Sequence, residues 1–170
     1  MHKSYLAFWR PGDLCWTQID IEGCGEFWNI YYFKGQFYMI TSVGVWVIDV
    51  AEPVVEPELL VQKNINGACW PHRKQLYLVE VSGALLLVAQ FSKCQRLGGS
   101  IDYKIYEFRT WELDLIKSKA KEIKSLGDRA NFLGGNGSIS IDSSKSIGVK
   151  ANHIYITDNW KGGDDRDMDS

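Results

Sequence analysis

Two stretches of the chain, FYMITSVGVWVIDV at residues 37–50 and LYLVEVSGALLLVA at residues 76–89, align without a gap. The offset is 39 residues, because this number separates Tyr38 from Tyr77 and Gly44 from Gly83. Each stretch contains a β-rich run, a glycine turn and a second β-rich run. A self-similar unit of about 40 residues made of strands and turns is typical of a β-propeller blade. We therefore predict an all-β fold whose function lies on a surface and not in a catalytic motif.

The rest of the chain also predicts short strands separated by turns. Glycine, proline and Asn-Gly signals divide the sequence into runs rich in aromatic and β-branched residues. The strands expected outside the repeat cover residues 5–9, 15–21, 28–33, 58–62, 103–115, 130–133, 138–141 and 153–157. Residues 92–100 predict a polar connection. Residues 117–126 fit either a helix or a hairpin, and the strands on both sides favour the hairpin.

The number of blades follows from the length of the chain. At about 40 to 50 residues each, roughly three and a half blades fit into 170 residues, whereas ring closure needs at least about four. The prediction is a partial β-propeller of kelch-like four-stranded blades, roughly three to four in number, over residues 1–160. Residues 161–170 are acidic and poor in apolar side chains, which predicts a disordered tail. Either the missing blades lie upstream in a longer protein, or another chain completes the ring.

Charge and hydropathy argue against two classes of partner. The chain has 19 basic and 21 acidic side chains, a net charge of −2, and no long basic stripe. Nucleic acid binding is therefore disfavoured, since it needs clustered Lys and Arg to neutralise phosphates. No segment approaches the roughly 20 apolar residues of a membrane-spanning helix, so no membrane partner is expected.

The cysteines indicate a compartment and argue against a metal site. Cys15, Cys24, Cys69 and Cys94 are too far apart for a Cys-x-x-Cys knuckle. The apolar run at the N-terminus is too short for a secretory signal. We expect reduced thiols in a cytoplasmic or nuclear protein, and an organellar location stays open.

No pattern of catalytic residues stands out in the sequence. The three histidines, His2, His72 and His153, are scattered, and no cysteine or carboxylate lies at ligand spacing from them. Neither a nucleophile elbow nor a zinc-binding His-Glu-x-x-His motif is present. The sequence predicts no catalytic residues, no cofactor and no metal, although loops of such a scaffold could bind a small molecule.

Four segments resemble a known plant family. SLGDRANFLGGNGSIS at residues 125–140 resembles the signature SLGDRALFLG-N-SFSV of the F-box-associated β-propeller domain of the KIB type. YLAFWRPGDLCW at 5–16 resembles the A-x-x-R-P-G-D-x-x-W opening of that family, and YFKGQFY at 32–38 its Y-x-G-K-F-Y hairpin. NHIYITD at 152–158 is similar to its closing N-x-I-Y-F-T-D. The motifs occur in the family's order and span residues 5–158.

The resemblance implies a protein-recognition domain. In full-length members an F-box docks on a cullin-based ubiquitin ligase core, and the propeller captures the substrate. Only four residues precede Tyr5 in this sequence, and they contain no F-box. We therefore expect a protein partner for this chain but no direct assembly with the cullin ligase.

Four residues are candidates for partner binding because of their chemistry and expected loop placement. Trp70, His72 and Arg73 belong to the segment WPHR, and Trp and Arg dominate binding hot spots. Arg129 follows the glycine turn of the SLGDR motif, where it could instead form a salt bridge between blades. Trp16, Trp46 and Trp111 are expected to be buried between sheets.

The sequence thus predicts a protein-binding propeller module without enzymatic activity, similar to the substrate-recognition domain of plant F-box proteins. Three alternatives stay open: a truncated fragment without independent function, a propeller that binds a small molecule, and an enzyme that uses the central channel. The last would need converging acidic, histidine or metal-binding residues, and the sequence offers none.

Overall fold

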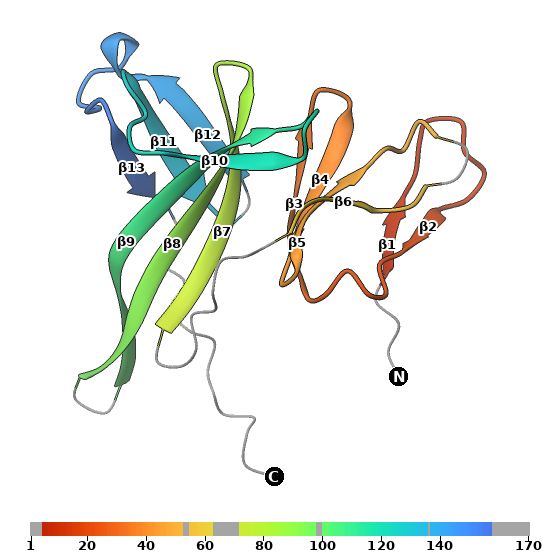
Figure 1. Ribbon diagram of the computed structural model, residues 1–170, viewed down its shortest axis with the longest axis horizontal. Helices are drawn as coiled ribbons and strands as arrows, with labels where there is room; N and C mark the ends of the chain where they lie inside the picture. The colour runs from red at the N-terminus through yellow and green to blue at the C-terminus, as the bar shows by residue number, and fades with distance from the viewer. Residues whose placement is uncertain (1–4, 53–54, 63–71, 98–99, 136, 158–170) are drawn as a thin grey trace. The chain divides into compact units, whose positions relative to one another are not determined.

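The computed structural model describes residues 5–52, 55–62, 72–97, 100–135 and 137–157. These residues form β-strands, turns and one short 3-10 helix, which confirms the all-β prediction (Figure 1). The chain divides into two compact units. The first contains Met1–Ile65 and Asp114–Lys119, and the second contains Asn66–Leu113 and Ala120–Ser170.

The first unit contains a two-stranded and a four-stranded antiparallel sheet. Its strands are β1 (Tyr5–Phe8), β2 (Thr17–Asp20), β3 (Phe27–Phe33), β4 (Gln36–Thr41), β5 (Gly44–Ile48) and β6 (Glu58–Gln62). Strands β1 and β2 form a hairpin, and the other four follow one another in the order β3-β4-β5-β6. Such a four-stranded meander is the blade unit that the sequence predicts.

The core of the first unit lies between these two sheets. Ile19 of β2, Met39 of β4 and Ile48 of β5 are almost fully buried and belong to one apolar cluster with Ile21 and Cys24. Because side chains alternate between the two faces of a strand, this cluster uses one face of each sheet. Burial of each large aliphatic side chain contributes about 1.5–3 kcal/mol to folding.

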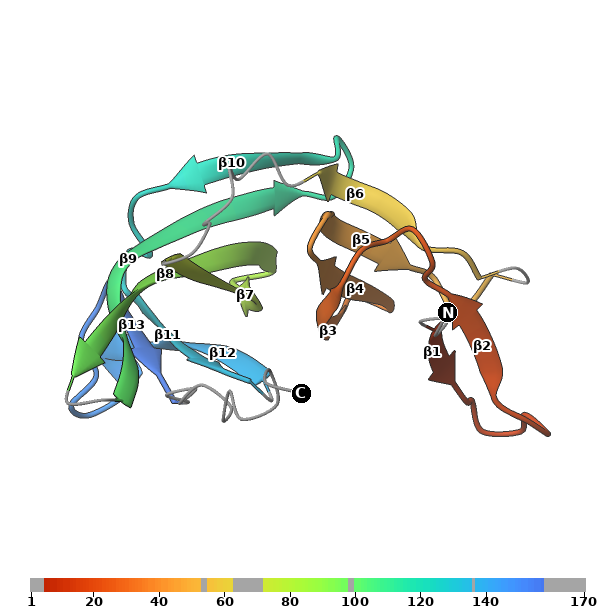
Figure 2. The same cartoon turned by 90° about the horizontal axis from the view of Figure 1, so that it is seen from below.

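The second unit contains another four-stranded meander and a three-stranded sheet. The strands are β7 (His72–Val81), β8 (Ala84–Leu97), β9 (Ser100–Asp114), β10 (Lys119–Ile123), β11 (Arg129–Gly134), β12 (Gly137–Asp142) and β13 (His153–Ile156), with the 3-10 helix η1 at Ser143–Lys145. The sheet orders are β10-β9-β8-β7 and β12-β11-β13. Strand β13 runs parallel to β11 and pairs with the side of it away from β12, and Figure 2 shows these three strands together.

The second unit has a core of its own between its two sheets. Tyr77, Val79, Leu86 and Val88 of the meander meet Leu133 of β11, and all five side chains are buried. Partly buried apolar side chains surround this cluster: Val81, Phe108, Ile123, Leu126, Ile154 and Ile156.

The structure corrects the phase of the predicted repeat. The two aligned stretches are both hairpins, but 37–50 covers the second and third strands of one meander, whereas 76–89 covers the first and second strands of the other. The equivalent hairpins are β3–β4 and β7–β8, which close with the pairs Phe33↔Gln36 and Val81↔Ala84. These pairs lie 48 residues apart. The alignment at 39 failed because two apolar runs around a glycine describe any hairpin of a blade.

The two glycines of that alignment also serve different physical purposes. Gly83 has a φ of 82° in a two-residue turn, matching Gly35 with 87° in the equivalent hairpin. Positive φ values suit glycine, and such turns fit the twist of hairpin strands. Gly44 instead begins β5, where a Cβ would collide with the carbonyl oxygen of Val61 on β6. Gly44 therefore permits close strand approach and does not form a turn.

Strand pairing confirms one further prediction and contradicts another. The hairpin over residues 117–126 is confirmed, since β10 follows a turn in which Ser118 has a φ of 51°. The polar connection predicted at 92–100 is wrong, because β8 and β9 stay paired from Ser92↔Ile105 to Leu97↔Ser100. Cross-strand backbone hydrogen bonds stabilise strands whose side chains are polar, so polarity alone does not indicate a loop.

Candidate functional site

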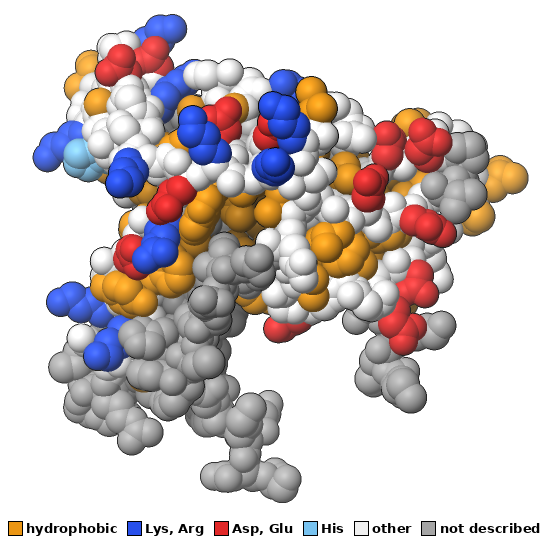
Figure 3. Space-filling model, viewed as in Figure 1, with side chains coloured by type: hydrophobic (Ala, Val, Ile, Leu, Met, Phe, Trp, Pro, Cys, Tyr) orange, Lys and Arg blue, Asp and Glu red, His pale blue; other side chains and the backbone are white. Residues whose placement is uncertain are grey.

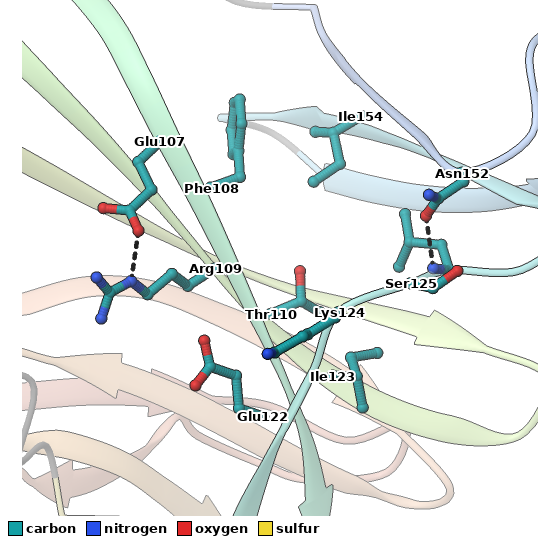
Figure 4. Close-up of a pocket in the computed structure, with 11 residues that line it drawn as sticks. Glu107, Phe108, Arg109, Thr110, Glu122, Ile123, Lys124, Ser125, Asn152 and Ile154 are labelled. Atoms are coloured by element: carbon teal, nitrogen blue, oxygen red, sulfur yellow. Dashed lines mark hydrogen bonds and ion pairs between the residues drawn. The ribbon is translucent and has the colours of Figure 1, made fainter.

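An open groove of about 350 Å³ lies in the second unit, beside the meander sheet and strand β13. Residues of β9 and β10 form one wall, and β13 with the turn before it contributes the other (Figure 4). The lining residues are Glu107, Phe108, Arg109, Thr110, Glu122, Ile123, Lys124, Ser125, Leu126, Asn152 and Ile154.

The floor of the groove is apolar and continuous with the core. Phe108, Ile123 and Ile154 line the groove and also pack against the buried cluster of the second unit. Because these side chains are anchored in the core, they present a fixed surface to anything that enters.

The rim of the groove carries charges of both signs. The Arg109 Nε donates to Glu107 Oε1 at 2.7 Å, and this hydrogen bond raises the pKa of Arg109. Glu122 and Lys124 are exposed near the end of β10 and complete the charged rim (Figure 4). An apolar floor with a charged rim is the usual composition of a protein–protein interface.

Both walls of the groove end in outer strands. Strand β10 is the last strand of the meander, and β13 is the last strand of the three-stranded sheet. An outer strand presents unpaired N–H and C=O groups along its length. Among the described strands, no further strand covers either edge, so an extended segment could pair with one of them.

The SLGDR motif forms the closed end of this region. The Leu126 N–H donates to Asn152 Oδ1 at 2.8 Å, and Gly127 N–H donates to Ser125 Oγ at 3.1 Å. Asn152 has a φ of 56°, a conformation in which asparagine is several-fold enriched over most non-glycine residues. Asn152 thus holds the loop that leaves β10 against the turn that enters β13.

Arg129 connects three parts of the second unit. Its carbonyl oxygen accepts from the Asn152 N–H at 2.8 Å, and its Nη2 donates to Ser82 Oγ at 2.8 Å. Ser82 belongs to the turn between β7 and β8, so this bond joins the two sheets. The guanidinium of Arg129, predicted as a partner contact, therefore has a hydrogen-bond partner within the fold.

The WPHR segment is placed only in part. Trp70 lies outside the described residues. His72 and Arg73 belong to β7, where they pair with Lys93 and Ser92, and not to the predicted loop. The pairing register of β7 with β8 continues the hairpin that Gly83 closes, which explains why the strand begins earlier than its sequence suggests. The structure therefore does not bring these residues together with Arg129 in one described site.

The prediction that Trp16 is buried is wrong. Its side chain is 67% exposed, and Trp9 across the same hairpin is 48% exposed. Trp46 does pack against the core of the first unit, and its Nε1 donates to Thr41 Oγ1 at 3.0 Å. Trp16 differs because β2 begins only at Thr17, so Trp16 precedes the paired strand.

The groove residues could not be found by looking for catalytic chemistry. Glu107, Arg109, Glu122 and Lys124 are ordinary surface charges in the sequence, and only the pairing of β9 with β10 brings them together. One sequence feature that could have pointed to the groove is the SLGDR motif together with Asn152. The backbone and side chain of Asn152 hold the loop of this motif at one end of the groove. Within the described residues, no group of three His, Cys, Asp or Glu side chains is arranged to hold a metal ion. The same residues contain no helix of a length and hydropathy that would cross a membrane.

Four-stranded antiparallel meanders that follow one another along the chain define this protein as part of a β-propeller. The chain belongs to the family described as KIB1-4 beta-propeller, which it matches over residues 1–169. The partial propeller predicted from the repeat and the chain length is thereby confirmed, and so is the family resemblance.

Curated relatives come from Arabidopsis thaliana. The chain is 26% identical over 168 residues to a protein named as F-box/kelch-repeat, covering 97% of this chain and 43% of that relative. It is 27% and 25% identical to two proteins named as F-box proteins, covering 92% and 85% of this chain and 44% and 43% of the relatives. The chain thus spans less than half the length of these relatives. No solved structure matches the chain.

Proposed function

We propose that this chain is a protein-binding propeller module that captures a partner protein, as the substrate-recognition part of an F-box protein does. Its role in this proposal is binding and not catalysis. The observation that carries the proposal is the groove of the second unit, which combines an apolar floor, a charged rim and two outer strands. Membership of a propeller family whose relatives are named F-box proteins supports it.

The groove suits an extended segment of the partner. A strand that pairs with β10 or β13 would gain main-chain hydrogen bonds, while one side chain in two would reach the floor. Glu122 and Lys124 would then select the charge pattern of that segment, because like charges directly opposite each other are destabilising. In this proposal an F-box, and not the propeller residues, makes the contact with a cullin ligase core.

The compartment in this proposal is the cytoplasm or the nucleus. Cys15, Cys24 and Cys94 are free thiols, which suits a reducing environment.

Affinity purification of the tagged chain, beside the same chain fused to an F-box, tests the proposal. We expect both versions to recover one specific protein, identified by mass spectrometry, and the fusion to shorten the half-life of that protein. Recovery of chaperones alone by both versions would contradict the proposal and favour a fragment without independent function.

A further inference from the structure

The loop between β1 and β2 presents large apolar side chains to solvent. The last pair of this hairpin is Phe8↔Thr17, so Trp9 and Trp16 are the next residues on its two strands. Their side chains are 48% and 67% exposed, and Leu14 in the same loop is fully exposed. Two exposed tryptophans at one hairpin end are unusual, because soluble proteins bury most of the surface of this residue.

A network of hydrogen bonds holds this loop in one conformation. The Asp13 carboxylate accepts from the backbone N–H and the Nε of Arg10, at 2.9 and 3.3 Å. The Trp9 Nε1 donates to the Asp13 carbonyl oxygen at 2.9 Å, and Arg10 Nη1 donates to the Val50 carbonyl oxygen at 3.1 Å. The loop is therefore preorganised, so a partner would bind it with a smaller loss of conformational entropy.

The segment of the first unit that contains this loop has an excess of acidic side chains. Residues 5–62 contain eight acidic side chains and only two basic ones, Arg10 and Lys34. Arg10 is already paired with Asp13. Glu52 lies two residues beyond Val50, whose carbonyl oxygen anchors Arg10. Acidic side chains also gather over this part of the molecule in Figure 3.

We propose that the 9–16 loop is a second docking surface, for a partner segment in which Lys or Arg lies beside a large aliphatic or aromatic side chain. The acidic surroundings attract the cation, and the exposed indole face of Trp16 stabilises it by a cation–π interaction. The neighbouring apolar residue of the partner packs on Trp9 and Leu14. This surface lies within the first unit and is independent of the groove in the second, although it shares the premise that the chain binds proteins.

A fluorescein-labelled peptide, Gly-Ser-Lys-Leu-Lys-Phe-Lys-Leu-Ser-Gly, is the probe for this surface. Fluorescence anisotropy is measured with the full chain, with Trp16→Ala and with Tyr106→Ala. Tyr106 is a matched control, because its aromatic side chain is 53% exposed but belongs to the second unit. We expect Trp16→Ala to weaken binding about 30-fold, as for a binding hot spot, and Tyr106→Ala to leave it unchanged.

Two control peptides test the chemistry of the partner. One carries Glu in place of every Lys, and the other carries Ser in place of Leu and Phe; both should bind at least about tenfold more weakly. Added salt should also weaken the binding of the Lys peptide, because it screens exposed charges. Equal affinity for the Lys and Glu peptides, equal affinity of the Trp16→Ala chain, or no binding of the Lys peptide would overturn the assignment.

Failure of this proposal can be distinguished from failure of the proposed function. If the peptide does not bind the 9–16 loop, the groove can still bind a partner, because the groove is tested by affinity purification and by variants of its own rim residues. Circular dichroism of Trp16→Ala guards against unfolding, which is not expected for a side chain this exposed.

Discussion

The two units of this protein share a scaffold and differ in surface. Each contains a four-stranded meander that begins with a two-residue hairpin turn, and each has its own buried apolar cluster. Among the described residues, the first unit carries nine acidic and four basic side chains, whereas the second carries seven acidic and eleven basic ones. The first unit presents tryptophans on a pinned loop, and the second presents a groove with a mixed charged rim. The same blade scaffold can thus carry surfaces of opposite net charge. Its stability depends on the alternate residues of each strand that face inward, and not on those that face solvent.

Removal of a core side chain gives the largest expected effect and tests whether the two clusters are separate. Leu133→Ala should lower the free energy of unfolding by about 2–5 kcal/mol, since it leaves a cavity in the second cluster. Hydrogen exchange read by mass spectrometry should then rise in β7–β13 and stay unchanged in β1–β6. Met39→Ala is the matched change in the first cluster and should give the reverse pattern. If either change raises exchange equally in both units, the two cores are one cooperative structure.

Asn131 is a buried polar residue on β11, the strand that contributes Leu133 to the second core. Its side chain is fully buried, and neither its Nδ2 nor its Oδ1 has a hydrogen-bond partner. The neighbouring Ser140 Oγ on β12 is unpaired as well. The family signature quoted above has leucine at the position of Asn131. We therefore expect Asn131→Leu to raise the free energy of unfolding by about 1–3 kcal/mol in urea denaturation, because it removes a buried unpaired amide.

Asn131→Ala controls for the loss of the polar group without filling its space. It should stabilise the protein less than Asn131→Leu, or destabilise it. A lower stability for Asn131→Leu than for the wild type would show that the amide has a partner in solution, such as a buried water.

Asn152 tests how the groove is closed. Asn152→Ala removes the acceptor of the Leu126 N–H and also places a Cβ-bearing residue without a local hydrogen bond at positive φ. We expect a loss of about 1–2 kcal/mol in thermal or urea unfolding. Asn152→Gly keeps the backbone conformation and loses only the side-chain bond, so it should lose less. If the two variants lose the same free energy of unfolding, the side-chain hydrogen bond accounts for the whole effect and the positive φ contributes nothing.

The smallest expected effect concerns acid pH in the tryptophan loop. The backbone N–H of Arg10 first, and its guanidinium second, hold the pKa of Asp13 below its usual range. A carboxyl whose pKa is lower in the folded state stabilises the protein above its ordinary pKa, and this stabilisation is lost as the pH falls through the folded value. The indole N–H resonance of Trp9 should therefore shift in NMR spectra at pH values below about 4.

Asp13→Asn is the control for this titration, and its Trp9 resonance should stay constant over the same pH range. The pKa of Asp142 in the second unit is also lowered, mainly by the Ser144 hydroxyl. The hydrogen bonds from Ser144 to the Asp142 carboxylate should be lost over a similar acid range. This result would show that each unit has a loop held by an ionised carboxylate. A Trp9 resonance that shifts equally in Asp13→Asn would contradict the assignment to Asp13.

Much of this fold could be predicted because strand alternation and turn residues are local signals. The hairpin turn at Lys34-Gly35 and the strands around it follow directly from the sequence. The phase of the repeat could not be predicted, because only pairing shows that Gly44 faces Val61 whereas Gly83 lies in a turn. The polar half of β8 was missed because its stabilisation comes from β9, which follows later in the chain.

The candidate site was harder to predict from the sequence than the fold was. The sequence places Arg129 just after the turn of the SLGDR motif, but its contact with Ser82 depends on the approach of two sheets. The exposure of Trp16 was missed because aromatic residues near strands are usually buried in such folds. The groove is made by residues from β9, β10 and β13, and their proximity is a property of sheet order.

Quantitative affinity purification with surface variants tests the central claim, partner binding by two distinct surfaces, most directly. The versions are the wild type, Trp16→Ala, the double exchange Glu122→Lys with Lys124→Glu, and Lys150→Glu as an exposed control outside the groove. The double exchange keeps the net charge and inverts only its order on the rim. We predict that each surface variant loses a protein that the wild type and Lys150→Glu both recover. Recovery of the same proteins in equal amounts by all four versions would contradict the account.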